Sequence, residues 1–219
     1  MGGLWVLFAL IALSALPVAG VFIWFRVSGY PLSLPWFAGF LGCGAAALLP
    51  AALLQSLFPP LDDVSFASLL FKTFIQIALT EEGGRLITLS ILVRLARPWE
   101  KTPGPARPSY AAAAGLLTGL GFALAETAFY GAMDLGLTLL RAITAAPLHG
   151  ACGARVGLAL FSMKEGPGAV RGVLRFCTAA AIHGMYNLMI ISPGVLPFLA
   201  VLIAFSALGS ALMTIHSGK

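Results

Sequence analysis

The sequence predicts an all-α integral membrane protein, built as a bundle of about seven transmembrane helices. Its 219 residues are 59% hydrophobic and only 10% charged, whereas a soluble domain typically carries about 25% charged residues. The mean hydropathy of +0.96 agrees with this composition. The three cysteines lie inside apolar segments without CxxC spacing, so neither a disulfide framework nor a zinc finger is expected. The chain is therefore expected to fold within a lipid bilayer.

Seven apolar runs have about the 20 residues that a helix needs to cross a bilayer. They cover residues 4–25, 35–58, 67–96, 110–132, 138–163, 173–192 and 195–215. The first continues without interruption to Phe25, and the second starts after Pro31 and Pro35. Proline, glycine and charged residues, which favour loops, separate the later runs at residues 59–63, 97–105, 164–168 and 192–194. We expect one membrane domain over residues 1–219, with a motif-bearing core at 66–192 and scaffold spans at 1–58 and 195–219.

Lysine and arginine gather in alternate loops, which predicts how the bundle is oriented. If the N-terminus lies outside, the inner loops hold Arg26, Arg94, Arg97, Lys101, Arg107, Lys164, Arg171, Arg175 and Lys219, and the outer loops hold Asp62, Asp63 and Asp134. Because cytoplasmic loops are enriched in basic residues, this asymmetry predicts that the N-terminus is outside and the C-terminus inside. It also accounts for the net charge of +5 without a nucleic-acid partner.

Five ionisable residues interrupt four of these apolar runs: Glu81, Glu82, Glu126, His149 and His183. A charge near the bilayer centre costs about 2.5–3.5 kcal/mol on insertion scales. A chain that tolerates this cost in four separate segments is expected to bring the groups together. Carboxylates and imidazoles that converge in apolar surroundings favour metal-assisted or acid–base hydrolysis.

The first motif places Glu81 and Arg85 four residues apart on a helix, so that their side chains meet on one face. The guanidinium would keep Glu81 ionised, as a general base must be. Glu82 points about 100° away and is a second candidate. Gly83 and Gly84 indicate close approach by a neighbouring helix, since glycine is otherwise unfavourable in a helix.

The other motifs supply polar neighbours for the ionisable residues. Tyr130 follows Glu126 by one turn, and Arg141 lies near the outer interface, where it could contact a substrate carbonyl. Asn187 lies one turn after His183 on the same helix face, where its amide could orient a water molecule or stabilise an oxyanion.

Zinc accepts histidine nitrogen and carboxylate oxygen, and catalytic zinc sites use three protein ligands with a water molecule. Glu126, His149 and His183 could supply these ligands from three helices, although the HExxH signature is absent. Glu81 would then take a proton from the metal-bound water. Without a metal, Glu81 and a histidine could activate water directly. Taken singly, each residue also fits a structural role, as an ion pair, a neutral acid or a buried imidazole.

The four motifs, in this order, resemble those of the PrsW family of intramembrane proteases, which is related to the CAAX-processing and bacteriocin-processing (CPBP) membrane proteases. The resemblance covers roughly residues 66–192 and rests on the segments 81–85, 121–130, 141–149 and 183–187. It implies a multi-helix protease whose glutamates and histidines form the site, and a membrane-anchored substrate such as an anti-sigma factor. The sequence departs from the family pattern at Arg85, Thr127 and Asn187, where lysine, asparagine and an acid are usual.

Two other classes of protein remain open. Buried glutamates and histidines also mark ion or proton pathways in transporters, although the internal repeat that many transporters show is absent. A non-catalytic membrane regulator could retain the motifs for structural reasons. The leading hypothesis is an intramembrane endopeptidase of a bacterial cytoplasmic membrane, with the bilayer and a membrane-anchored protein as its partners and zinc as its cofactor.

Overall fold

The computed structural model describes residues 2–30, 32–59, 65–96, 107–130, 134–164 and 168–217, and every regular element within these ranges is a helix. The predicted all-α class is therefore confirmed. The helices are α1 (Gly2–Val27), α2 (Leu34–Ala46), α3 (Leu48–Gln55), α4 (Phe66–Leu70), η1 (Phe71–Leu79), α5 (Thr80–Ala96), α6 (Pro108–Tyr130), α7 (Leu135–Ile143), α8 (Ala145–Met163), α9 (Ala169–Ile190) and α10 (Leu196–Ser217).

Six segments of the described chain are long and apolar enough to cross a membrane: Phe8–Val27, Leu34–Gln55, Pro108–Phe129, Leu135–Met163, Ala169–Ile190 and Leu196–Ser217. They correspond to six of the predicted runs. The remaining run, 67–96, forms the continuous stretch of α4, η1 and α5. This stretch is more polar than the others because it carries the first charged motif, and it is the part of the bundle that brings that motif into the interior.

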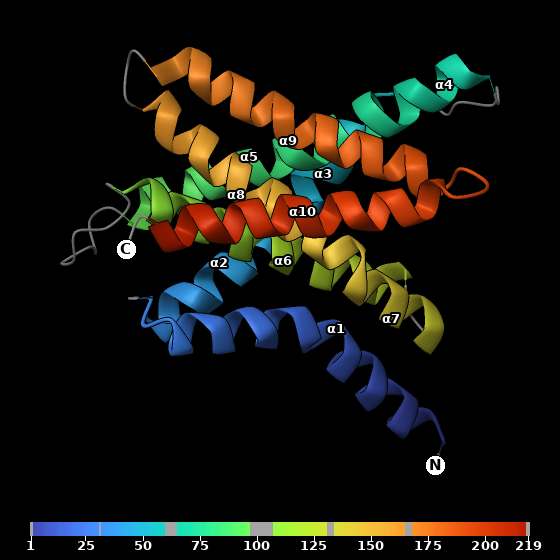
Figure 1. The fold of residues 1–219 in the computed structure, drawn as a ribbon, viewed down its shortest axis with the longest axis horizontal. Helices are drawn as coiled ribbons and strands as arrows, with labels where there is room; N and C mark the ends of the chain where they lie inside the picture. Colours follow the sequence, from blue (N-terminus) through green and yellow to red (C-terminus); the bar gives the residue numbers. More distant parts are fainter. Residues whose placement is uncertain are drawn as a thin grey trace.

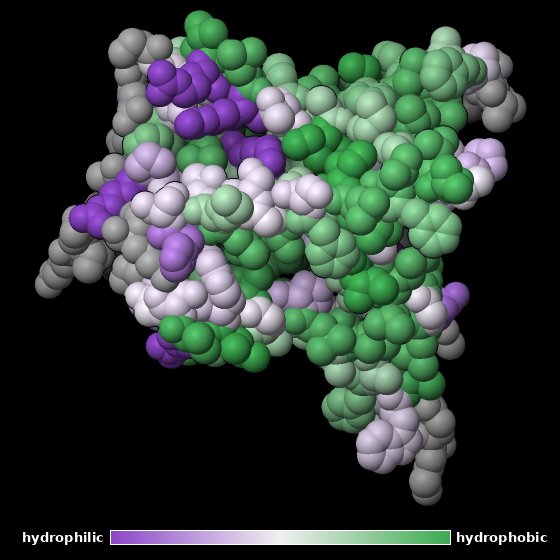
Figure 2. All heavy atoms as spheres, viewed as in Figure 1, coloured by the Kyte–Doolittle hydropathy of each residue, from purple (hydrophilic) through white to green (hydrophobic). Residues whose placement is uncertain are grey.

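The two ends of the bundle differ in charge. Figure 1 shows the C-terminal ends of α1, α8 and α10 and the first turn of α9 at the same end of the molecule. Most of the described basic residues of the predicted inner loops lie at or beside helix ends: Arg26, Arg94, Arg107, Lys164 and Arg171; Arg175 lies about two turns inside α9. On the face drawn in Figure 2, hydrophilic side chains gather toward the end of the molecule where α8 ends and α9 begins, and apolar side chains cover most of the remaining coloured surface. Orientation in the bilayer stays a prediction.

Several predicted loop charges lie outside the described residues: Asp62, Asp63, Arg97, Lys101 and Lys219. The described acid among the predicted outer-loop residues is Asp134, whose side chain accepts a hydrogen bond from the backbone N–H of Leu137 at the start of α7. The charge asymmetry between the inner and outer loops stays a sequence-based prediction.

Helices α6 and α8 form the centre of the bundle and touch backbone to backbone (Figure 1). A Cβ atom added to Gly115 would lie 2.0 Å from the carbonyl oxygen of Gly153, and one added to Gly157 would lie 2.0 Å from the carbonyl oxygen of Ala111. A Cβ added to Gly119 would lie 1.9 Å from the carbonyl oxygen of His149. Glycines on both helices allow this close packing, which fixes the backbone of His149, a candidate site residue, against α6.

Gly119→Ala is expected to destabilise the bundle by about 1–3 kcal/mol, because the added methyl group has no room unless α6 and α8 separate. The measurement is thermal unfolding of the purified protein in detergent. Gly39→Ala is the matched control, since a Cβ at Gly39 on α2 meets nothing within 4 Å. The control should unfold at the wild-type temperature or slightly above it, because alanine favours helix. Equal shifts in both variants would contradict this packing.

A π-helix directly precedes the first charged motif. Residues Phe71–Leu79 form η1, and α5 begins at the next residue, Thr80, so that Glu81 lies in the first turn of α5. Segments of π-helix are rare and often occur at functional sites. A Cβ at Gly84 would lie 2.9 Å from the carbonyl oxygen of Ala47, which confirms the predicted close approach of a neighbouring helix. At Gly83 a Cβ would make only an ordinary contact, 3.5 Å from the side chain of Leu54.

Candidate active site

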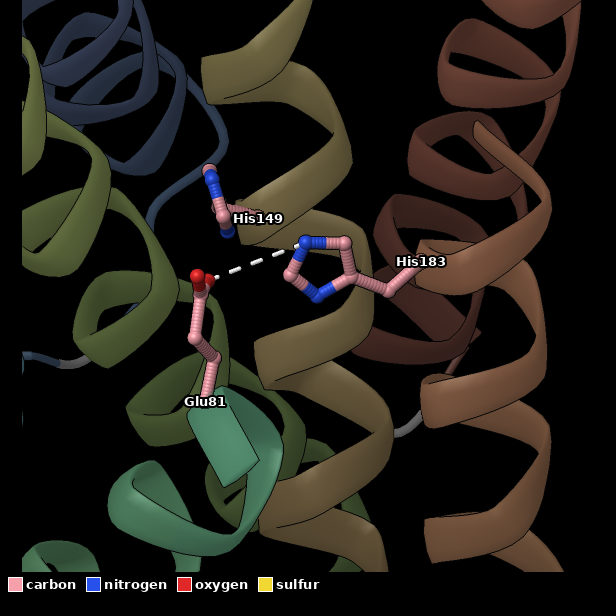
Figure 3. Close-up of side chains that lie close together, drawn as sticks. All are labelled: Glu81, His149 and His183. Atoms are coloured by element: carbon pink, nitrogen blue, oxygen red, sulfur yellow. Dashed lines mark ion pairs between the residues drawn. The ribbon is translucent and has the colours of Figure 1, made fainter. Parts of the chain in front are cut away.

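Three buried side chains predicted from the sequence converge inside the bundle. Glu81 extends from α5, His149 from α8 and His183 from α9, and Figure 3 shows all three pointing toward one another. Their exposed fractions are 6%, 3% and 2%. One ligand atom of each lies within 4.8 Å of the others, and no other such group of His, Cys, Asp or Glu occurs among the described residues.

A buried guanidinium connects these groups. Arg85 of α5 is fully buried, and its Nη2 atom forms an ion pair with Oε1 of Glu82. Its Nη1 atom lies 3.1 Å from Nδ1 of His149 and donates to the carbonyl oxygen of the same residue at 3.3 Å. Its Cζ atom lies 4.7 Å from the centre of the Phe122 ring, a cation–π distance. Arg85 therefore holds α5, α6 and α8 together at the site.

The predicted ion pair between Arg85 and the Glu81 carboxylate is wrong. The carboxylate partner of Arg85 is Glu82, and its hydrogen bond to Glu81 is made to the backbone oxygen at 3.4 Å. Side chains three and four residues apart both meet on a helix, so spacing alone does not choose between them. The choice follows from α9, because Glu82 also faces His183 across the bundle.

Glu82 sets the tautomer of His183. Oε1 of Glu82 lies 2.8 Å from Nδ1 of His183, while Nη2 of Arg85 lies 3.4 Å from the same nitrogen. A carboxylate only accepts and a guanidinium only donates, so the shorter contact assigns the hydrogen to Nδ1. The Nε2 lone pair is then available on the side of Glu81, whose Oε2 atom lies 3.7 Å away. A carboxylate that orients a histidine in this way is common behind metal-binding imidazoles.

Glu126 and Arg141 form the more accessible edge of the site. Oε2 of Glu126 lies 2.9 Å from Nε2 of His149 and accepts from Nη2 of Arg141 at 2.6 Å. Nε of Arg141 also donates to Oγ1 of Thr127 at 3.3 Å. The side chains of Glu126 and Arg141 are 14% and 19% exposed. Both ring nitrogens of His149 thus have partners, Arg85 at Nδ1 and Glu126 at Nε2, and a metal ion bound by His149 would replace one of these contacts.

The remaining candidates contribute less to this cluster. Asn187 is half-buried on α9 and makes no hydrogen bond with any described residue. The side chain of Tyr130 lies outside the described residues. Sequence reasoning gave no role to Phe122, whose ring lies over Arg85 and 5.3 Å from the ring of His149. Its position four residues before Glu126, on the same face of α6, was the available signal.

The donors of this cluster fit a divalent metal ion. Oε2 of Glu81 is buried and has no hydrogen-bond partner among the described residues, a costly arrangement unless a cation or water is present. Its 3.7 Å separation from Nε2 of His183 is near the roughly 3.4 Å between two ligands of a tetrahedral ion with bonds of about 2.1 Å. The sequence predicted Glu126 as the carboxylate ligand, but the structure places Glu81 in the three-residue group and Glu126 in an ion pair.

The fold and the site define a polytopic membrane protein with a buried carboxylate–imidazole centre, an arrangement suited to hydrolysis inside a bilayer. The model of the PrsW family of intramembrane metalloproteases matches residues 31–211, and the chain belongs to this family. It is thus an integral membrane protease, a hydrolase that acts on membrane proteins, and its family implies a metal ion. No curated protein and no solved structure matches the chain.

Proposed function

We propose that this protease hydrolyses a peptide bond of a membrane-anchored protein at the centre formed by Glu81, His149 and His183. The observation that carries the proposal is the meeting of these three groups, from three helices, around a buried carboxylate oxygen without a hydrogen-bond partner in the described chain. A membrane protein gains little stability from such an arrangement, because each group must be desolvated. Its use in catalysis explains why the bundle retains it.

Glu81, His149 and His183 would hold the metal, and two nitrogen ligands with one oxygen match the preference of Zn²⁺. When bound, the ion supplies Lewis acidity that polarises a scissile carbonyl and activates water at neutral pH. Glu82 holds the hydrogen on Nδ1 of His183, so that Nε2 faces Glu81. Arg85 fixes His149 through both its ring and its backbone.

We assign proton transfer to Glu126, the reverse of the roles expected for Glu81 and Glu126 from the sequence. Glu126 is the more exposed of the two carboxylates, so water and substrate reach it more easily. Its contact with Nε2 of His149 keeps it within reach of the reacting atoms, and Arg141 holds it as a carboxylate. Arg141 and Tyr130 would contact the substrate, and Asn187 would orient water or the developing oxyanion.

With the N-terminus outside, the end of α6 that carries Glu126 faces the outer half of the bilayer, and cleavage would occur there. A bacterial cytoplasmic membrane and an anti-sigma-factor-like substrate agree with this placement. We further propose that residues 66–192 carry the catalytic machinery, with 1–58 and 195–219 as supporting spans. The described candidate residues all lie on α5 to α9, inside that core.

Removal of the metal is the first test. We expect about one zinc per chain by elemental mass spectrometry, and its loss in a His149→Ala/His183→Ala variant. A chelator should lower cleavage of a membrane-anchored reporter in liposomes at least a hundredfold, and zinc should restore it, because Lewis acidity is lost and regained. His216→Ala is the matched control, since His216 lies near the end of α10 and outside the cluster.

Two results would contradict the proposal in different ways. Full activity in metal-free protein would exclude the metal centre and leave water activation to the carboxylates and imidazoles alone. Bound metal without cleavage of any membrane-anchored reporter would favour the non-catalytic regulator. Proton or ion flux that depends on Glu81 in the same liposomes would favour the transporter.

A further inference from the structure

One guanidinium outside the candidate active site, that of Arg155, has no carboxylate partner among the described residues. Arg155 of α8 donates to the carbonyl oxygens of Ala151 at 2.9 Å and Ala207 at 3.3 Å, and its Nη2 atom lies 3.4 Å from Oγ of Ser210. The described carboxylates belong to the cluster or to a helix end, and none pairs with Arg155: Glu81, Glu82, Glu126 and Asp134. Within the described chain, only neutral oxygen atoms face this charge.

The charge lies level with the middle of a candidate membrane span. Ala207 is halfway along the candidate span Leu196–Ser217, about 16 Å from either end at 1.5 Å per residue. The hydrocarbon core is about 30 Å thick, so the lipid phosphates, which lie beyond its edge, are more than about 15 Å away from this level. The hydrogen bond to Ala151, one turn back along α8, shows that the side chain does not extend toward the nearer end of its helix. Arg155 therefore does not reach the membrane surface.

Arg155 lines a shallow apolar groove of about 510 Å³ between α9 and α10. Ile182 and Met189 form the wall from α9, and Leu199, Leu202 and Ser206 form the wall from α10. The side of the groove is open, because Leu202 is 61% exposed. Figure 1 shows α10 crossing in front of α8, and α9 and α10 moving apart from the turn that joins them. The groove could accommodate another helix, and the Arg155 guanidinium lies among its lining side chains.

We propose that this groove binds a transmembrane helix of a partner protein that carries an acidic residue at mid-span, and that its carboxylate pairs with Arg155. The planar guanidinium is the side chain best suited to bind a carboxylate through two hydrogen bonds. A lipid phosphate is too far away to do this. A second copy of the chain offers no described carboxylate on a lipid-facing helix surface. Buried ionisable groups in membranes are typically paired with a partner of opposite charge.

Binding is tested with three synthetic transmembrane peptides that differ only at a central Asp, Asn or Leu. Association with the purified protein in liposomes is followed by energy transfer between fluorophores. We expect the Asp peptide to bind at least tenfold more tightly than the Asn and Leu peptides. Arg155→Gln should abolish this preference, and Arg155→Lys should retain part of it. Arg175→Gln is the matched control, because Arg175 also has only a carbonyl and a hydroxyl partner, Leu158 and Ser162, among the described residues.

A second pair of variants does not depend on the folding of Arg155 variants. Ser206→Trp fills the groove and should weaken binding of the Asp peptide at least tenfold. Gly209→Trp is the control: it adds the same side chain to α10 outside the groove lining, at a position where a Cβ meets nothing within 4 Å, and it should not change binding of the Asp peptide.

Equal binding of the Asp and Leu peptides would overturn the proposal in favour of a lipid chain. Self-association that requires Arg155 without any peptide would overturn it in favour of a second copy. Neither readout requires proteolysis.

Discussion

Glu81→Gln is expected to abolish both metal binding and peptide hydrolysis, whereas Glu126→Gln should abolish hydrolysis and leave the metal bound. Glu81 belongs to the three-residue ligand group, and its Oε2 atom has no other described partner. An amide is a much weaker ligand than a carboxylate, so the ion loses one of three protein ligands. Glu126 lies outside that group, and its replacement removes a proton acceptor worth about 10²–10⁴ in rate.

Metal content by elemental mass spectrometry and cleavage of a membrane-anchored reporter are measured on the same preparations. Asp134→Asn is the matched control, because it makes the same acid-to-amide change at the start of α7, where asparagine caps a helix about as well as aspartate. It should leave both measurements unchanged. If Glu126→Gln lost the metal while Glu81→Gln kept it, the assignment from the sequence would be restored and the one proposed here would be wrong.

Removal of the Arg85 guanidinium should produce the largest loss of stability. Arg85→Gln leaves Glu82 buried without its ion-pair partner and removes the contacts with His149. Loss of one partner from a buried ion pair typically costs about 3–5 kcal/mol. The measurement is unfolding in detergent, by heat or by titration with a denaturing detergent. Arg85→Lys should recover only part of the loss, since a single ammonium cannot replace the planar fork that reaches two helices.

The double variant Arg85→Gln/Glu82→Gln separates the ion pair from the rest of the contacts. With no carboxylate left unpaired, it should be more stable than Arg85→Gln alone, even though it carries one more substitution. The free energies of the two single variants should therefore not add. If the changes in unfolding free energy of the two single variants added up to that of the double variant, Glu82 and Arg85 would act independently and the ion pair would not stabilise the site.

Much of the site was predictable because a bilayer makes ionisable side chains conspicuous. Glu81, His149 and His183 each interrupt an apolar run, and the cost of such interruptions predicted that they converge, as the structure shows. Periodicity does not fix how each helix is rotated about its axis. For this reason the sequence predicted Glu81 instead of Glu82 as the carboxylate beside Arg85, and Glu126 instead of Glu81 as the carboxylate grouped with the two histidines.

Some features of the fold were likewise predictable from the sequence and others were not. Gly83 and Gly84 predicted a close approach by a neighbouring helix, and the structure shows it at Gly84 but only an ordinary contact at Gly83. The π-helix before Glu81 was not predicted, since nothing in the residue types of Phe71–Leu79 distinguishes a π-helix from an α-helix; the stretch packs on α9. Phe122 was passed over because an aromatic residue in an apolar helix is usually core.

The order of synthesis gives the neighbouring pair Glu82 and Arg85 a second role. Arg85 finds its partner on α8 64 residues later and its partner on α9 98 residues later in the chain. At about 5–20 residues per second, the ribosome needs roughly 5–20 s to deliver the last of them. During that interval the arginine and glutamate of α5, three residues apart, can form an ion pair with each other. A charge pair contained within one helix lowers the cost of placing this segment in the membrane before α8 and α9 follow it.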